Sequence, residues 1–430
     1  MSLRTGWLSL LPLIRPVGCS KLLGVLATLL LGACDVGGAP DSPPSPGFRQ
    51  IDSAGVLVSI TPGSEAQAKV GWRVDSIADL VLGARDSPSE GFYRIQGLRG
   101  TPDGGVVVVD GSSRELRFFD AGGRLERRVG RRGEGPGEFG DPVLVSTAGQ
   151  DSLVVWDVAL LRFQVFSMDG QESRTIRLTT RWPAGARPPV GAVGMRMLVE
   201  SSDLSHLLSR RAGPREVTVQ YLWVDPTGEI ESEITSISVV RLYHSSGGGR
   251  WSSGLSGIPF TVGPSASVTE GGAFIADGVS AEIRGYDLQG SLRRVFRVDA
   301  ERRPVTSDLI EAEVAERAAA TNASRDFLEW LFSQMPIPDT LPAFQALQLD
   351  ELGWLWAEVY DFDPRRPRQW VVFDAEGRAQ GTVETPAGLE IQWIGRDAIL
   401  GVWRDEFDVE YVRRYPLDRR AGAPGADPEG

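Results

Sequence analysis

The chain has 430 residues and a formal net charge of −12, with 24% charged residues. An acidic chain gains little affinity for nucleic acid from counterion release, so nucleic acid is excluded as a partner. Its two cysteines, Cys19 and Cys34, leave residues 35–430 without any disulfide. The 51 glycines and 12 tryptophans, with few long helical patterns, favour β structure with tight turns.

The N-terminal region combines a basic residue, an apolar run and a small-residue motif that ends in cysteine. Lys21 precedes the apolar residues 22–30, which are followed by Leu31-Gly32-Ala33-Cys34. The run is about a dozen residues long, whereas a helix needs roughly 20 to span a bilayer. The pattern resembles the lipobox of bacterial lipoproteins. The resemblance implies a signal peptide over residues 1–33 and an acylated Cys34, with membrane lipid as its partner. An uncleaved anchor helix is the alternative.

The next segment and the end of the chain are poor in residues that could build a core. Pro, Gly and Ser dominate residues 34–50, which we expect to form a flexible tether, and residues 421–430 form a similar disordered tail. These assignments leave residues 51–420 for the folded domain. An acylated chain of this kind is expected in the cell envelope, lipid-anchored on the extracytoplasmic side of a membrane, either periplasmic or at the outer surface.

An imperfect repeat fills the folded domain. Each unit has an apolar strand, a second strand that often ends in an aromatic residue, an Asp-x-x-Gly segment and a third strand. The copies span residues 106–123, 153–170, 220–228, 273–290 and 355–377, with a faint sixth at 399–418. The Asp can bond nearby backbone and the Gly accepts a positive φ, which is turn chemistry. Units of this length favour the four-stranded blades of a β-propeller, and a β-sandwich is the alternative.

The segment between the first two copies carries a more specific signal. Residues 130–142 include Gly135, Gly137, Phe139 and Pro142, and this spacing resembles the Gly-rich inter-blade loop of NHL-repeat propellers. More broadly, the chain resembles six-bladed propeller lipoproteins of the NHL and TolB-like groups. The resemblance implies an all-β, six-bladed propeller, although seven blades also fit the length. We expect the opening strand, residues 55–60, to complete the last blade and close the ring.

Residues 306–335 interrupt the strand pattern with apolar residues at helical spacing. Asp308 is predicted to cap a first helix, with Glu311 three residues on, and Ser324 to cap a second. We favour a helical insertion packed on a blade edge over a lid that covers one propeller face.

Candidate chemistry is sparse. His206 and His244 are the only histidines, and a zinc site normally needs more His or Cys ligands. The acidic clusters at 361–363 and 405–408 suit turns better than calcium sites. The strand-ending Asp110, Asp157 and Asp277 recur in several copies, which predicts a hydrogen bond that builds each blade. The loop at 245–257, with Trp251, is a candidate for binding.

These observations predict no catalytic residue, no metal ligand and no cofactor, and they do not identify ligand-binding residues. We therefore expect a membrane-anchored, extracytoplasmic propeller lipoprotein that acts as a binding or protein-interaction scaffold. Its partner would be a protein or a small molecule at a propeller face. The main alternative is an NHL-like lyase or hydrolase with a metal in the central channel. A structural envelope protein without a ligand is a third alternative.

Overall fold

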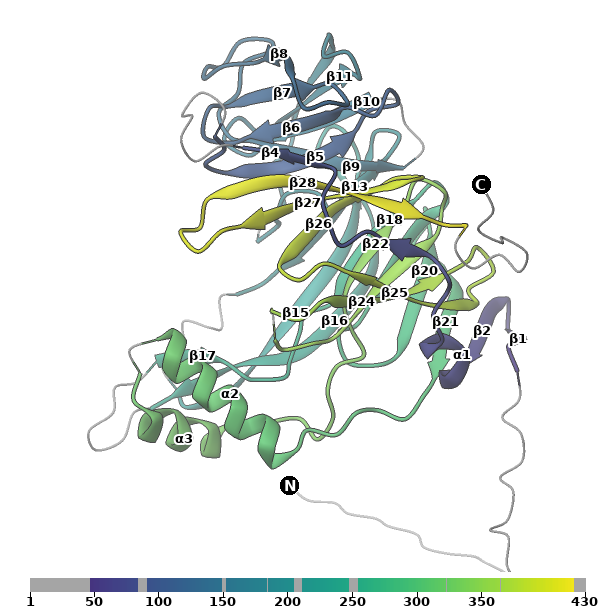
Figure 1. The fold of residues 1–430 in the computed structure, drawn as a ribbon, viewed down its shortest axis with the longest axis vertical. Coiled ribbons are helices and arrows are strands. Elements are labelled where there is room, and N and C mark those ends of the chain that lie inside the picture. Colours follow the sequence, from purple (N-terminus) through teal and green to yellow (C-terminus); the bar gives the residue numbers. More distant parts are fainter. Residues whose placement is uncertain are drawn as a thin grey trace, which may run out of the picture. The chain divides into compact units, whose positions relative to one another are not determined.

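The computed structural model describes residues 47–83, 91–148, 152–183, 185–204, 211–246, 254–321, 323–363 and 365–420. The chain divides into two units, Met1–Pro44 and Ser45–Gly430, and every described residue belongs to the second. The predicted signal peptide, Cys34 and the tail at 421–430 therefore lie outside the described residues. Antiparallel strands dominate the described part (Figure 1). No helix in these ranges combines the length and the apolarity needed to cross a bilayer.

The first complete sheet is a four-stranded antiparallel meander. Its strands are β5 (Ile95–Gly100), β6 (Val106–Asp110), β7 (Glu115–Phe119) and β8 (Leu125–Val129). All four valines of β6 are 0% exposed. Val106 and Val108 pack in one apolar cluster with Leu400, whereas Val107 and Val109 pack in another with Leu153. Alternate side chains thus enter the cores on the two faces of the sheet, which explains the continuous apolar run in the sequence.

The second sheet has nine strands and consists of two antiparallel meanders. The first is β9 (Pro142–Ala148), β10 (Ser152–Asp157), β11 (Arg162–Ser167) and β12 (Glu172–Arg177). The second is β13 (Gly191–Val193), β14 (Arg196–Ser202), β15 (Gly213–Val224), β16 (Ile230–Ser245) and β17 (Gly254–Gly257). A short parallel pairing of β9 with β13 joins them. Within each meander, consecutive strands pair with one another, as the sequence repeat predicts.

Three more sheets complete the described part. One contains β18 (Ser265–Thr269), β19 (Gly272–Ala276), β20 (Glu282–Asp287) and β21 (Leu292–Asp299), extended at its outer edge by β2 (Val56–Pro62) and β1 (Arg49–Ser53). The next contains β22 (Phe344–Leu349), β23 (Leu355–Val359), β24 (Arg368–Phe373) and β25 (Ala379–Thr385). The last contains β26 (Leu389–Ile394), β27 (Ala398–Arg404) and β28 (Glu410–Asp418).

The N-terminal segment closes the ring, but not through the strand that we expected. The expectation for residues 55–60 is wrong, because β2 pairs in parallel with β21 and does not reach the last sheet. After α1 (Gly63–Gln67), the chain follows the outer edge of β25, where the Thr382 amide donates to the Ala68 carbonyl at 2.6 Å. It then forms β3 (Arg73–Val74) and β4 (Leu80–Leu82), both paired with β28. The last sheet is therefore completed by residues 73–82.

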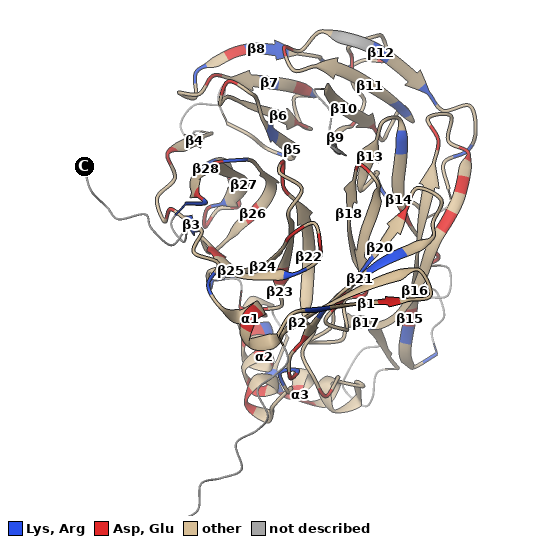
Figure 2. Cartoon of the chain, turned by 90° about the vertical axis from the view of Figure 1, so that its right-hand side faces the viewer, with Lys and Arg blue, Asp and Glu red and all other residues tan. Residues whose placement is uncertain are grey.

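The sheets are arranged around a common centre, and each packs face to face against its neighbours (Figure 2). The first strands of the meanders, among them β5, β9, β18, β22 and β26, lie nearest the centre, and the later strands lie progressively further out. This arrangement is a β-propeller, so the predicted fold class is confirmed.

The helical insertion is also confirmed. It consists of α2 (Ser307–Ala320) and α3 (Arg325–Gln334). Ser324 caps α3 as predicted, since its hydroxyl accepts the Phe327 amide at 3.3 Å. The N-cap of α2 is Thr306 and not Asp308, because the helix begins two residues earlier than expected and the Thr306 hydroxyl accepts the Leu309 amide. Val314 and Phe332 pack with Ile258 and Tyr243, beside the long extension of β16.

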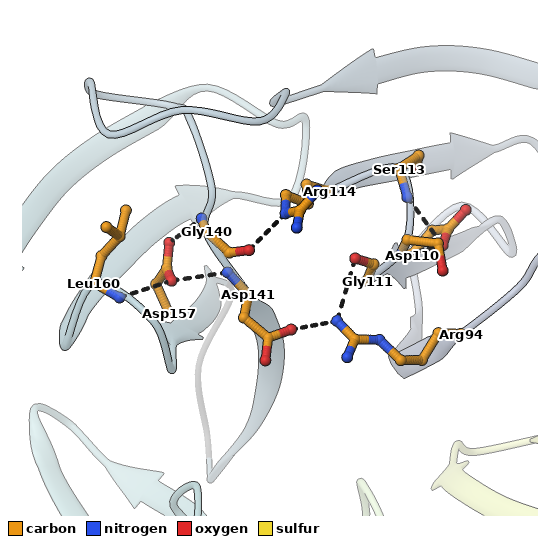
Figure 3. A network of polar contacts seen from close by, with 10 residues as sticks. Arg94, Asp110, Gly111, Ser113, Arg114, Gly140, Asp141, Asp157 and Leu160 are labelled. Atoms are coloured by element: carbon orange, nitrogen blue, oxygen red, sulfur yellow. Dashed lines mark hydrogen bonds and ion pairs between the residues drawn. The ribbon is translucent and has the colours of Figure 1, made fainter.

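Aspartates build the turns and strand ends of the blades. In the Asp-x-x-Gly turns the carboxylate accepts the amides two and four residues on, as at Asp120, Asp225, Asp287 and Asp350. The strand-ending Asp157 also joins segments within its own meander, because it accepts the amides of Gly140, Asp141 and Leu160 at 2.8, 3.0 and 3.1 Å (Figure 3). The predicted blade-building hydrogen bonds are thus confirmed.

The ring closure makes a prediction about stability. Leu82 on β4 is 5% exposed and packs with the core between the first and last sheets, whereas its neighbour Val81 is 51% exposed. Leu82→Ala should lower the free energy of unfolding by about 2–5 kcal/mol, because it removes buried methyl groups and leaves a cavity. Val81→Ala is the matched control and should cost less than about 1 kcal/mol. Denaturant unfolding of both variants checks this, and equal losses would contradict the closure described above.

Candidate functional site

A cavity of about 1240 Å³ occupies the centre of the propeller. Its wall is built by the innermost strands, so residues far apart in the sequence share one surface. Representative wall residues are Gly97 on β5, Leu144 on β9, Ser267 on β18, Leu349 on β22 and Trp393 on β26. None of the helical residues of α2 or α3 belongs to the described lining. The helical insertion therefore packs beside the long extension of β16, as we favoured. The cavity wall gives no support to the alternative of a lid.

The mouth of the cavity is formed by hairpin turns. The turns that contribute include 269–272 between β18 and β19, 350–354 between β22 and β23, and 395–397 between β26 and β27. Charges of both signs border it: Arg99, Glu270, Asp287, Arg293, Arg294, Asp350, Glu351, Asp374 and Arg396. Such a mouth suits a polar ligand rather than an apolar one.

Several of these charges are already engaged within the protein. Asp287 accepts a hydrogen bond from Arg293 at 2.7 Å, and Asp374 accepts the amides of Glu376 and Arg378. In the described part of the chain, the exposed side chains of Glu270 and Arg396 form neither a hydrogen bond nor an ion pair, although the Arg396 carbonyl accepts a hydrogen bond from Arg419. These two side chains are therefore the mouth charges most available to a ligand.

A buried ion pair fixes one side of the mouth. The Asp350 side chain is 0% exposed, and its Oδ2 accepts hydrogen bonds from Arg419 at 2.7 Å and from the Trp356 indole at 3.0 Å. The Arg419 guanidinium also lies 4.4 Å from the ring centre of Trp72 and donates to the Gly395 carbonyl. Because a buried charge without a partner is costly, this contact locks the 350–354 turn to the end of β28.

Glu351 and Trp393 form the adjoining part of the mouth. A Cβ atom at Gly100 or Gly395 would collide with the Trp393 ring, so only glycine leaves room for the indole at these two positions. Partial burial raises the pKa of the Glu351 carboxyl, although the residue as a whole is exposed. Three influences lower the pKa of Glu351: the charge of Arg99, a hydrogen bond from Trp393 and the charge of Arg396.

A metal in the central cavity, as the enzyme alternative requires, would need side chains placed to hold it. Within the described ranges, no group of three or more His, Cys, Asp or Glu side chains is placed to hold a metal ion. His244 lies on β16 and is not part of the cavity wall, and His206 lies outside the described residues. The cavity residues therefore do not fit a channel metal, and we derive no reaction through one. Trp251 also lies outside the described residues.

The Gly-rich loop at 130–142 has a structural role. It wraps around Arg162, a fully buried side chain whose guanidinium donates to the carbonyls of Glu134, Gly135 and Glu138 at 2.7, 2.8 and 2.6 Å. Phe139 is buried beside it. The carbonyls converge on an arginine, which is the opposite of the converging amides that hold a phosphate.

The acidic clusters also have local roles. Asp361 accepts the Asp363 amide at 3.0 Å, and Asp405 accepts the amides of Phe407 and Val409 at 2.9 and 3.0 Å. These are turn contacts, as expected. Sequence reasoning missed Arg99, Glu351 and Trp393, which three different sheets bring together. The only available signal was the position of Glu351 directly after the turn residue Asp350.

No family model matches the chain, and no curated protein matches it. Among solved structures, a putative exported protein from Bacteroides fragilis is 11% identical, with a TM-score of 0.41 over 84% of this chain and 99% of its own. A DUF4221 family member from Bacteroides vulgatus is 10% identical, with a TM-score of 0.44 over 80% and 99%. Virginiamycin B lyase from Staphylococcus aureus is 10% identical, with a TM-score of 0.35 over 81% and 99%. Similarities this low carry no argument, so the fold is assigned from the strand pairing of the chain itself.

The surroundings of Glu351 predict how its titration responds to substitution. Arg99→Gln should raise the pKa of Glu351 further, because it removes the strongest influence that opposes the burial effect. NMR titration of the side-chain carboxyls checks this, with Glu351→Gln to assign the resonance. Arg73→Gln, at an exposed position away from the mouth, should leave the midpoint unchanged. A Glu351 midpoint that stays constant or falls in Arg99→Gln would contradict the geometry.

Proposed function

We propose that this protein is a lipid-anchored, extracytoplasmic β-propeller that binds a small polar ligand in its central cavity. The observation that carries the proposal is the cavity of about 1240 Å³, walled by strands and bordered by charges of both signs. Binding cavities for small molecules typically measure about 300–1,000 Å³ and combine an apolar wall with a few polar groups. A cavity of this size accommodates a small molecule together with ordered water.

The family and the blade number belong to the same proposal. The nine-stranded sheet consists of two meanders, so the five sheets contain six such units, and we infer six blades. The loop at 130–142, with its buried Phe139, supports kinship with NHL-type propellers. A propeller without a catalytic constellation in its described residues is best understood as a binding protein. A protein partner would bind at the same cavity mouth.

The proposed location rests on residues 21–34, which carry the lipobox pattern. Acylation of Cys34 would hold the chain at a membrane surface without spanning it. The Pro- and Gly-rich residues that follow would act as a tether between the lipid and the propeller.

The anchoring proposal predicts the behaviour of the two cysteines. When the chain is expressed in a bacterial host with an alkyne-tagged fatty acid, the wild-type protein should be labelled and recovered with membranes. Cys34→Ser should abolish labelling, because it removes the sulfur that carries the lipid. Cys19→Ser is the matched control and should be labelled normally. Labelling that survives in Cys34→Ser, or that disappears in Cys19→Ser, would rule out this anchor.

The ligand proposal predicts that filling the cavity abolishes binding. Ser267 lines the cavity on β18, so Ser267→Trp should occupy part of its volume. Ser236→Trp on the exposed surface of β16 is the matched control. Wild-type protein is screened by thermal melting against amino acids, sugars, nucleosides and short peptides. A ligand at ~100-fold its Kd stabilises the folded state by about 2.7 kcal/mol, which raises the melting temperature measurably.

We expect at least one compound to raise the melting temperature of the wild type and of Ser236→Trp but not that of Ser267→Trp. Melting of the free variants first establishes that each one is folded. A compound that stabilises all three equally binds elsewhere and would contradict the proposed site. So would the absence of any stabilising compound in the whole panel.

A further inference from the structure

A second polar cluster lies beside the central cavity, away from the hairpin mouth. It consists of Arg187, Glu200, Tyr221 and Arg241. Glu200 on β14 and Tyr221 on β15 are directly opposite each other in the strand register. The Arg187 amide donates to the Glu200 carbonyl at 3.0 Å, and its side-chain Nε lies 3.6 Å from Glu200 Oε1. These contacts bring the first three side chains to one place.

A β-bulge brings the fourth side chain to the cluster. Arg215 pairs with Leu242 and Glu216 pairs with Val240, so Arg241 is an extra residue on β16 without a partner across the ladder. Bulges redirect a side chain and recur next to functional sites. The Arg241 guanidinium lies against Gly263, where a Cβ atom would collide with it. The bulge thus directs a charged group toward the inner side of the propeller.

The cluster adjoins the central cavity but is not part of its lining. Val190 and Ala266 line that cavity, each three residues after Arg187 and Gly263, respectively. The strand β18 begins two residues after Gly263 and runs to the mouth turn at 269–272, so the cluster lies near the end of that strand that is opposite the mouth. None of the four cluster residues belongs to the lining of the mouth cavity.

Two groups in the cluster have unused hydrogen-bonding capacity. Tyr221 is 0% exposed, and its hydroxyl is buried without a hydrogen-bond partner among the described residues. Arg241 is half-buried, and within the same ranges its guanidinium forms no hydrogen bond and no ion pair. Burial lowers the pKa of Arg241, and the nearby Arg187 acts in the same direction. Buried polar groups normally have partners, so these donors indicate a polar ligand.

The charges of the cluster define the class of ligand. Two guanidinium groups and one carboxylate leave a single net positive charge, which a monoanion would balance. A planar guanidinium binds a carboxylate through two parallel hydrogen bonds, and a phenol hydroxyl can donate a third. A dianion such as phosphate would be repelled by Glu200. From the bulge, the unpartnered hydroxyl and this charge balance, we propose that the cluster binds the carboxylate of a small monocarboxylic acid.

The test uses the full-length protein and defined probes. Binding of acetate, propionate, butyrate and hexanoate is measured by calorimetry and thermal melting at constant ionic strength, with chloride as the reference anion and phosphate as the dianionic comparator. The variants are Arg241→Gln and Tyr221→Phe. Arg284→Gln, a partly exposed arginine on β20, is the matched control.

We expect at least one monocarboxylate to bind the wild type and Arg284→Gln more tightly than phosphate does. Arg241→Gln and Tyr221→Phe should each weaken that binding by about tenfold or more, since each removes a donor to a charged group. Without ligand, Tyr221→Phe should melt at a higher temperature than the wild type, because it removes a buried hydroxyl that has no partner. If the Tyr221 hydroxyl only stabilised the fold, Tyr221→Phe would melt at a lower temperature than the wild type.

Three results would overturn the proposal. They are the absence of binding by every monocarboxylate in the series, unchanged affinity in both variants, and phosphate binding at least as tight as the best monocarboxylate. The mouth ligand is tested by Ser267→Trp and different compounds, so either proposal can fail while the other stands.

Discussion

The pairing of β4 with β28 is the contact on which the rest of the structure depends. Each sheet of the propeller is apolar on both faces, as the fully buried valines of β6 show, so each needs a neighbour on both sides. The first and last sheets can cover each other only if the ring is closed. Residues 80–82 provide that closure, and their leucines pack in the same core as Leu98, Leu400 and Val412. Without it, the apolar faces of two sheets would meet water.

The polar contacts of the propeller are of two kinds. In the turns, aspartate carboxylates bond amides a few residues away, so these contacts can form without the rest of the ring. Other polar contacts join neighbouring sheets. The Asp350–Arg419 pair ties a mouth turn to the end of β28, and Arg94 forms an ion pair with Asp141 between the first two meanders (Figure 3). The mouth turn at 350–354 thus depends on the packing of two neighbouring sheets.

The sequence predicted the parts of the fold that are local. Apolar runs such as residues 106–109 and 153–156 mark buried strands, the Asp-x-x-Gly segments mark turns, and Ser324 marks a helix start. The sequence did not predict the contacts between segments that lie far apart in the chain. Residues 55–60 are an apolar strand that could pair with any free edge, and the true closing strand, Leu80–Leu82, is too short to stand out. The sites were missed for the same reason: Trp393 and Glu351 come from different sheets, and the bulge at Arg241 has no sequence signature.

Hydrogen exchange at the closing strands tests this account most directly. If β4 and β28 hold the ring together, the amides that these two strands donate to each other should exchange only through global unfolding. They should then exchange as slowly as those of β6, which serves as an internal reference in the fully buried part of the fold. Exchange at the closing strands that is orders of magnitude faster than in β6 would show a ring that opens there readily. That result would contradict a closed propeller as the basis of both proposed sites.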